Sequence, residues 1–179
     1  MKTTGAASRS SGAGTPPLAG DGTVPNRVLS TAEAAAWRAD LGRQGKRVVF
    51  TNGVFDILHP GHVRYLAEAR RHGDALIVAI NSDRSVRAIK GPERPIHPEA
   101  ERAEVITALA SVDAAVIFDE DTPYEIVTAI QPDILVKGAD WPADQIVGRD
   151  IVEARGGVVI RVPVEEGHST TGVLRKLKG

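Results

Sequence analysis

The chain has 179 residues, about one domain of ordinary size (~150 residues). Its 22 Lys and Arg residues nearly balance its 23 Asp and Glu residues, so there is no basic excess that would favour nucleic acid as a partner. The lack of cysteine excludes disulfides and thiol nucleophiles, and no apolar run approaches the ~18 residues of a membrane-spanning helix, so we expect a cytoplasmic protein that does not insert into membranes.

The first residues differ in composition from the rest of the chain. Residues 1–26 are rich in Gly, Pro, Ser, Thr and Ala and contain no aromatic residue. Such a segment buries too little apolar surface to offset the entropy of ordering it. We therefore predict a disordered tail over 1–27 and one folded domain over 28–179. A Ser-x-x-Glu capping box at Ser30 and Glu33 predicts that the first helix starts there.

After this helix, short apolar runs alternate with helical patterns. The apolar runs, which are typical of strands buried on both faces of a parallel sheet, lie at 47–51, 75–81, 114–118, 134–137 and 158–162. The helical patterns lie at 62–72, 99–110, 123–131, 144–155 and 170–178, and a second capping box is expected at 122–125. The alternation predicts an α/β fold, a Rossmann-like three-layer sandwich around a five-stranded parallel sheet.

The loop after the first of these strands contains two closely spaced histidines. Ligands of open α/β sheets bind beyond the carboxyl ends of the strands, where this loop lies. His59 and His62 flank a Pro-Gly pair at the start of the next helix, whose N-terminus offers free N–H groups and the positive end of the helix dipole. Phosphate is therefore the expected ligand. The alternatives are histidines with a structural role, or a metal bound by Asp56 and both histidines; the Pro-Gly break and the lack of a nearby fourth ligand argue against the metal.

Two further loops at the same predicted edge carry groups that suit phosphate. Lys137 ends an apolar strand, from which its ammonium group would reach the mouth of the crevice; an aliphatic stem that merely brings the charge to solvent is the alternative. Hydroxyl side chains open the last predicted helix at 169–171, which indicates a second phosphate-binding helix terminus.

The segment 90–95 is expected to be a flexible cationic loop. Its functional interpretation is a mobile clamp in which Lys90 and Arg94 neutralise phosphate charge on closure. The chain has neither a P-loop nor a G-x-G-x-x-G fingerprint after a strand, so any nucleotide must be held in another way.

The sequence Thr-Asn-Gly-Val-Phe-Asp-Ile-Leu-His-Pro-Gly-His at 51–62 resembles the HxGH nucleotidyltransferase superfamily. With the segments 81–83, 90–95, 119–123, 132–140 and 169–171, it resembles more narrowly the adenylyltransferase part of bifunctional heptose kinase/adenylyltransferases. The resemblance covers about residues 28–178, so we expect a stand-alone counterpart of that part. It implies the strand order 3-2-1-4-5 and a homodimer.

The resemblance also implies a reaction and a set of site residues. The phosphate oxygen of D-glycero-β-D-manno-heptose 1-phosphate would attack the α-phosphorus of ATP in line, with Mg²⁺ carried by ATP and no protein metal site. The implied catalytic residues are His59, His62 and Lys90. The implied nucleotide- and phosphate-binding residues are Thr51, Asn52, Gly53, Phe55, Gly61, Lys137, Gly138, Asp140, Ser169, Thr170 and Thr171. The implied substrate-binding residues are Asp56, Asn81, Asp83 and Arg94.

Two alternative functions stay open. One is a cytidylyltransferase acting on glycerol 3-phosphate or another small phosphate; such enzymes usually carry Arg-Thr-Glu-Gly-Ile-Ser, and residues 164–169 lack the Arg, which weakens the case for CTP. The other is a nucleotide-sensing module without catalysis, since a fold does not determine a function.

Overall fold

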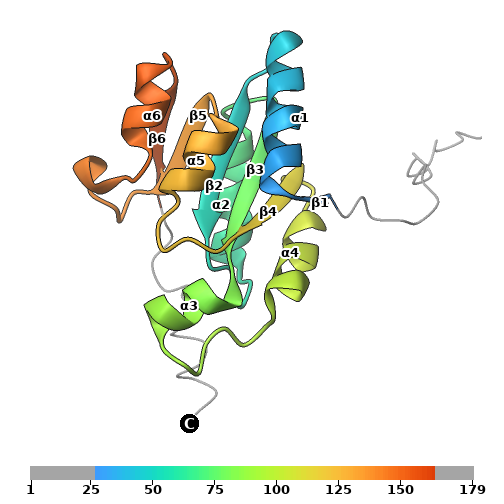
Figure 1. Ribbon diagram of the computed structural model, residues 1–179, viewed down its shortest axis with the longest axis vertical. Coiled ribbons are helices and arrows are strands. Elements are labelled where there is room, and N and C mark those ends of the chain that lie inside the picture. Colours follow the sequence, from blue (N-terminus) through green and yellow to red (C-terminus); the bar gives the residue numbers. More distant parts are fainter. Residues whose placement is uncertain (1–26, 164–179) are drawn as a thin grey trace, which may run out of the picture.

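A parallel sheet of six strands, covered by helices on both faces, forms the part of the chain that the computed structural model describes, residues 27–163 (Figure 1). The strands are β1 (Val28–Leu29), β2 (Val48–Gly53), β3 (Ala75–Asn81), β4 (Ala114–Phe118), β5 (Ile134–Gly138) and β6 (Val158–Val162). They lie in the order β1-β4-β3-β2-β5-β6. Without β1 this is the predicted order 3-2-1-4-5, so the fold class is confirmed. The prediction of five strands was one short, because a two-residue strand has no periodic pattern.

The helices form two layers and one separate element. They are α1 (Thr31–Arg43), α2 (Pro60–Arg70), α3 (Asp83–Lys90), α4 (Glu99–Thr107), α5 (Tyr124–Ile130) and α6 (Arg149–Ala154), with a 3₁₀ turn η1 (Ala143–Gln145). The apolar core on one sheet face includes residues of α1, α5 and α6, and the core on the other face includes residues of α2 and α4. In Figure 1, α3 lies beyond the ends of the strands, at the bottom of the view.

Alternate residues of each central strand serve the two cores. In β2, for example, Phe50 belongs to one buried cluster and Val49 to the other. Because successive side chains of a strand point to opposite faces, a strand covered on both sides must be apolar throughout. This requirement explains the continuous apolar runs in the sequence.

The start of α1 follows the prediction. Ser30 is its N-cap: the Ser30 hydroxyl accepts a hydrogen bond from the Glu33 N–H, and the Glu33 carboxylate accepts one from the Ser30 N–H at 2.8 Å. The capping box is therefore confirmed.

One helix was missed and two local predictions were wrong. The missed helix is α3, which ends at the start of the 90–95 loop and buries only Ser85 and Val86. The single helix expected at 144–155 is interrupted at Gly148, whose φ of 86° a side chain rarely tolerates. The second capping box is absent, since Pro123 takes the N-cap position of α5 and makes no side-chain cap bond. The helix expected at 170–178 lies outside the described residues.

A buried arginine joins the loops at the carboxyl end of the sheet. The Arg102 guanidinium, on α4, is fully buried. It donates to the carbonyl oxygens of Val54 (2.7 Å), Asn81 (2.8 Å) and His97 (2.9 Å) and to the carboxylate of Asp83 (2.8 Å). These partners follow β2, end β3, begin α3 or precede α4, so one side chain sets the spacing of three loops.

We predict that Arg102→Met lowers the free energy of unfolding by about 2–4 kcal/mol, because it leaves buried carbonyls and a carboxylate without their donor. Urea denaturation measures the change. Arg43→Met is the control: Arg43 pairs with Asp40 on the exposed side of α1, and such a pair contributes about 1 kcal/mol at most. Equal losses in the two variants would contradict this role of Arg102.

Candidate active site

A cavity of about 550 Å³ opens at the carboxyl ends of β2, β3 and β5. Its position follows from the sheet: β2 pairs with β3 along its whole length, up to Gly53 and Ile80, whereas the pairing of β2 with β5 stops at Phe50 and Leu135. The carboxyl ends of β2 and β5 therefore separate, which is where open α/β sheets hold ligands. The predicted site residues that line the cavity are Asn52, Gly53, Phe55, Asp56, His59, Gly61, His62, Asn81, Lys90, Arg94, Lys137, Gly138 and Asp140.

Tyr65, on α2, bridges the gap between the two separating strands. Its hydroxyl donates to the Val136 carbonyl at 3.2 Å and lies 2.8 Å from the Thr51 hydroxyl. Since the Tyr65 proton points to Val136, the Thr51 hydroxyl is the donor of the second bond. Burial raises the pKa of Tyr65 to about 12, so the phenol stays protonated.

The bridge changes the role expected for Thr51. Its side chain is fully buried, and Thr51 is not among the residues that line the cavity. The Thr51 hydroxyl thus holds Tyr65 in the wall, and the phosphate contact expected of Thr51 stays a prediction. Tyr65 was not predicted from the sequence as a residue of the site. It lies three residues after His62 on α2, and this spacing places both side chains on the same face of the helix.

The two histidines stack at the N-terminus of α2. His59 is the N-cap, and its Nδ1 accepts a hydrogen bond from the His62 N–H at 3.4 Å. The rings lie 3.7 Å apart and nearly parallel, and the Phe55 ring meets His62 edge-on at 5.3 Å. Burial, and then the charge of His59, lower the pKa of His62 to about 4. At neutral pH, His62 is therefore an uncharged imidazole on the cavity lining, with a single ring N–H that bonds to the Ile57 backbone.

Gly53 makes room for the Phe55 ring that supports His62. A Cβ atom at position 53 would lie 2.9 Å from that ring. The backbone of Phe55 itself has a φ of 46°, so the chain folds back sharply after β2. Besides lining the cavity, Gly53 thus allows a close contact within the loop.

Lys137 is buried at the end of β5. Its ammonium group donates to the Asn52 side-chain oxygen at 2.5 Å and lies 5.7 Å from the centre of the Trp141 ring. Burial lowers the pKa of Lys137 to about 8, and the Asp140 carboxylate partly opposes that effect. The prediction that Lys137 reaches the crevice is confirmed by its place on the lining.

Asp56 holds the segment that follows α3. Its side chain is only 1% exposed and accepts hydrogen bonds from Arg94 Nε at 2.5 Å, Ile96 N at 2.7 Å and His97 N at 3.0 Å. Burial raises the pKa of Asp56, but these bonds outweigh burial and hold the pKa below its ordinary value. Asp56 lines the cavity while both of its carboxylate oxygens accept hydrogen bonds from the protein, and its contact with substrate stays a prediction. Arg94 ties the cationic loop to Asp56, and the closure of that loop stays a prediction as well.

Two other residues expected to bind substrate have different surroundings. Asp83 is not among the cavity-lining residues and its carboxylate binds Arg102, so its predicted substrate contact stays a prediction without support from this placement. Asn81 does line the cavity, with its amide donating to the Ser85 hydroxyl at 3.1 Å. The proposed phosphate-binding residues Ser169, Thr170 and Thr171 lie outside the described residues.

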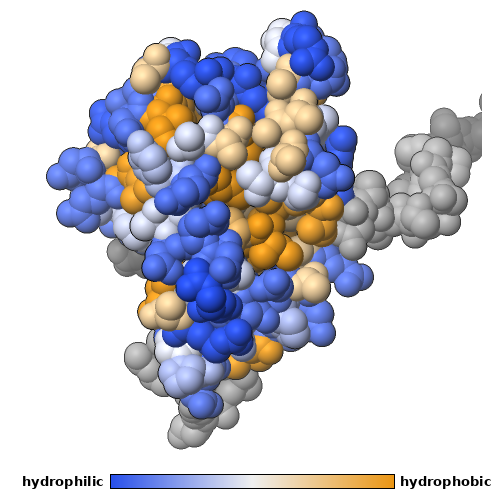
Figure 2. Space-filling model, in the orientation of Figure 1, coloured by the Kyte–Doolittle hydropathy of each residue, from blue (hydrophilic) through white to orange (hydrophobic). Residues whose placement is uncertain are grey.

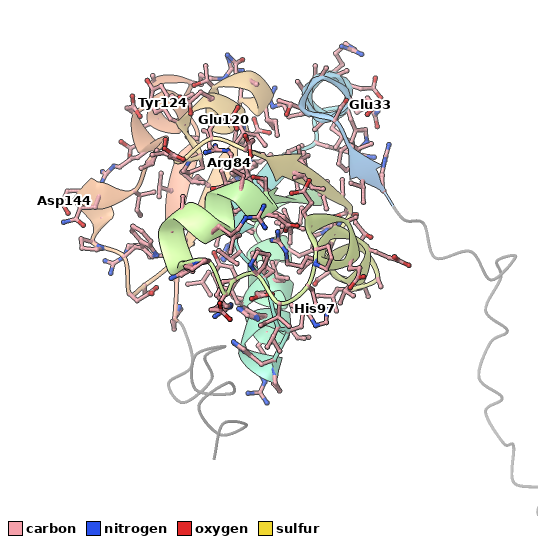
Figure 3. All side chains as sticks on the ribbon, turned by 60° about the horizontal axis from the view of Figure 1, so that its bottom comes forward. Glu33, Arg84, His97, Glu120, Tyr124 and Asp144 are labelled. Carbon is pink, nitrogen blue, oxygen red and sulfur yellow. The ribbon has the colours of Figure 1, made fainter. Side chains whose placement is uncertain are left out.

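Several lining residues were not predicted. They are Val54, Tyr65, Ile89, Asp121, Pro123, Trp141, Gln145, Ile146 and Val147. Most come from α3, the loop after β4, and the loop after β5, whose places only the tertiary structure shows. In Figure 3, Arg84 on α3 lies beside the loop that carries Glu120, and His97 lies on the segment after α3. Between residues 27 and 163, no three His, Asp or Glu side chains are grouped so as to hold a metal ion.

We predict that Lys137→Met raises the free energy of unfolding at pH 7 by about 1–3 kcal/mol, because it removes a buried charge. The folded-state pKa of about 8 lies below the ordinary 10.5, so wild-type stability should rise between these pH values. The difference in free energy of unfolding between Lys137→Met and wild type should therefore become smaller as the pH increases. Urea denaturation at pH 7 and at pH 9.5 measures it. The exposed Lys46→Met is the control, and a Lys137→Met protein less stable than wild type at pH 7 would contradict the prediction.

Comparisons with known proteins agree with this geometry. Residues 50–175 match the family described as cytidylyltransferase-like. The chain is 56% identical over 151 residues to the bifunctional protein HldE of Gluconobacter oxydans, covering 84% of this chain and 32% of that protein. It is 48% identical over 160 residues to the HldE of Hyphomonas neptunium, covering 89% and 32%. The chain thus spans about a third of the length of these curated relatives.

Solved structures are similar as well. A lipopolysaccharide core biosynthesis protein from Thermoplasma volcanium is 32% identical with a TM-score of 0.56, the match covering 69% of this chain and all of that one. A protein from Archaeoglobus fulgidus, 22% identical with a TM-score of 0.52, shares the fold. None of the helices between residues 27 and 163 has the length and apolar character needed to cross a membrane. The sequence match, the fold and the histidine site together show that the chain belongs to the cytidylyltransferase-like family of nucleotidyltransferases.

Proposed function

We propose that the chain transfers AMP from ATP to D-glycero-β-D-manno-heptose 1-phosphate, giving ADP-heptose and pyrophosphate. The observation that carries the proposal is the stacked His59–His62 pair at the N-terminus of α2, on a cavity that also presents Lys90 and Lys137. Imidazole donors, helix N–H groups and two amines suit a triphosphate. The choice of heptose rests on the sequence resemblance and on the relatives named HldE.

In the proposed reaction, a phosphate oxygen of the sugar 1-phosphate forms a bond to the α-phosphorus of ATP while the bond from that phosphorus to the β-phosphate bridging oxygen breaks. The nucleophile is already an anion and pyrophosphate is a good leaving group, so no general base is required. His62 gives the single N–H of its neutral imidazole to the phosphoryl oxygens, in place of the bond to the Ile57 backbone that it makes without substrate. Lys90 and Lys137 reduce the negative charge that the two substrates bring together.

Lys90 ends α3, a helix rich in charged residues. Figure 2 shows strongly hydrophilic side chains over α3, as well as at the other end of the view. Of this helix, Ile89 and the cationic Lys90 line the cavity, although the net charge of the whole chain is only −1.

Magnesium is expected to arrive bound to the triphosphate, where it neutralises charge. Asp121 and Asp140 are carboxylates on the cavity lining that could hold its water shell. Magnesium in such complexes is bound chiefly by phosphate oxygens and water, so few protein ligands are needed. A homodimer, which the resemblance implies, stays a prediction.

The nucleotide is the part of the proposal to test first, since the family description refers to cytidylyl transfer. Pyrophosphate release is measured with each of the four nucleoside triphosphates against heptose 1-phosphate, other sugar 1-phosphates and glycerol 3-phosphate. We expect turnover with ATP and heptose 1-phosphate. Turnover with CTP and glycerol 3-phosphate in its place would identify a cytidylyltransferase, and nucleotide binding without turnover would identify a sensor.

We predict that His62→Ala lowers kcat by about 10²–10³-fold, because it removes a donor that acts mainly in the transition state. Circular dichroism checks that the variant is folded. Because the pKa of His62 is about 4, deprotonation of this group should cause no loss of wild-type activity as the pH rises through 6.5. A His62→Ala protein with normal pyrophosphate release would contradict the mechanism.

A further inference from the structure

We propose that Asp56 is a positioning residue: it grips Arg94 through Nε and thereby presents the two terminal nitrogens of the guanidinium to the phosphate of the acceptor substrate. The inference deepens the proposed function, because it assigns the acceptor phosphate to one side of the cavity. It replaces the sequence-based expectation that Asp56 itself binds substrate.

The geometry of the pair leaves one edge of the guanidinium available. Asp56 binds Arg94 through Nε only. Among residues 27–163, the terminal nitrogens of Arg94 have no hydrogen-bond partner, although its side chain is only 14% exposed and lines the cavity. Phosphate binds guanidinium best through two parallel N–H bonds, which a terminal nitrogen and its neighbour can supply.

Asp56 is held too firmly to be a ligand itself. One carboxylate oxygen accepts the N–H groups of Ile96 and His97, and the other accepts Arg94 Nε. An anionic substrate would be repelled by a free carboxylate, but here Arg94 compensates the charge of Asp56. The bonds to Ile96 and His97 also secure the backbone next to Arg94, so the guanidinium is placed before substrate arrives.

The position of Arg94 assigns the two substrates to different sides of the cavity. Arg94 belongs to the segment that follows β3 and α3, whereas Lys137 and Trp141 end or follow β5, and β3 and β5 lie on opposite sides of β2. Asn81, at the end of β3, adds a polar side chain near the acceptor side. A hydroxyl-rich sugar phosphate suits this polar side.

The test measures binding of inorganic phosphate to the full chain by ³¹P NMR titration, with and without α,β-methylene-ATP filling the nucleotide site. We expect Arg94→Gln to weaken phosphate binding about 10-fold or more, and Asp56→Asn to weaken it several-fold, because a charge-assisted bidentate contact is lost or misplaced. The double variant should bind no more weakly than Arg94→Gln alone, since Asp56 acts through Arg94. Unchanged binding in Asp56→Asn, or losses that multiply in the double variant, would overturn the proposal.

A second variant covers the case in which Asp56→Asn does not fold. Arg94→Lys keeps the positive charge. A single ammonium group, however, cannot replace both the Nε bond to Asp56 and the two parallel N–H bonds to phosphate. We expect it also to bind phosphate several-fold more weakly, and wild-type affinity would overturn the proposal.

The chain offers a matched control at the opposite end of the sheet. Arg70 donates through Nε to Asp113 at 2.8 Å, and Asp113 also accepts from the Leu76 N–H. Arg70→Gln and Asp113→Asn remove a similar pair far from the cavity, so phosphate binding should not change. A loss as large as in the Asp56 and Arg94 variants would show that general destabilisation is the cause, and would overturn the proposal.

Kinetics separates this inference from the proposed function. With active protein, Asp56→Asn and Arg94→Gln should raise KM for the sugar phosphate and leave KM for ATP within about 2-fold. If no nucleotide and sugar phosphate react in the wild type, the proposed function fails while the phosphate titration still decides the role of Asp56. An increase in KM for ATP alone would overturn the assignment to the acceptor.

Discussion

The site depends on two buried charges of opposite sign, Asp56 and Arg102, which both bind the backbone of His97. The His97 carbonyl accepts a hydrogen bond from Arg102, and the His97 N–H donates to Asp56. Arg102 also binds Val54, in the loop that leads to the histidines. The histidine loop and the cationic loop are thus held by the same two ions. Both ions have several hydrogen-bond partners, and they need them because a buried charge left unpaired costs folding free energy.

The cavity has its own origin in the divergence of β2 from β5. Where the backbone pairing stops, side chains take over: Tyr65 connects Thr51 to Val136, and Lys137 reaches Asn52. A buried ammonium group is unfavourable for folding, as its lowered pKa shows. The proposed function explains why it is present, because an anionic ligand needs a cation there. Functional residues often lower the stability of a fold in this way.

The acidic residues near the site illustrate how one residue type serves different purposes. Asp56 and Asp83 both occur in segments that the sequence marks as functional, but their carboxylates bind arginines of the protein. Asp140 is instead exposed on the cavity lining. The sequence does not distinguish an aspartate that supports a loop from one that faces the cavity. Their difference depends on which cation lies nearby in space.

The sequence by itself determined five of the six described strands in chain order and most of the helices between them, the edge of the sheet that carries the chemistry, and the histidine pair at a helix N-terminus. These follow from apolar periodicity, helix signals and the geometry of parallel sheets, all read from near neighbours in the chain. Only the tertiary structure decided that Thr51 supports the wall, that Tyr65 and Trp141 line or bridge the cavity, and that Asp56 grips Arg94. Those contacts join residues far apart in sequence, and the choice of such partners depends on packing across the whole sheet, which no local pattern records.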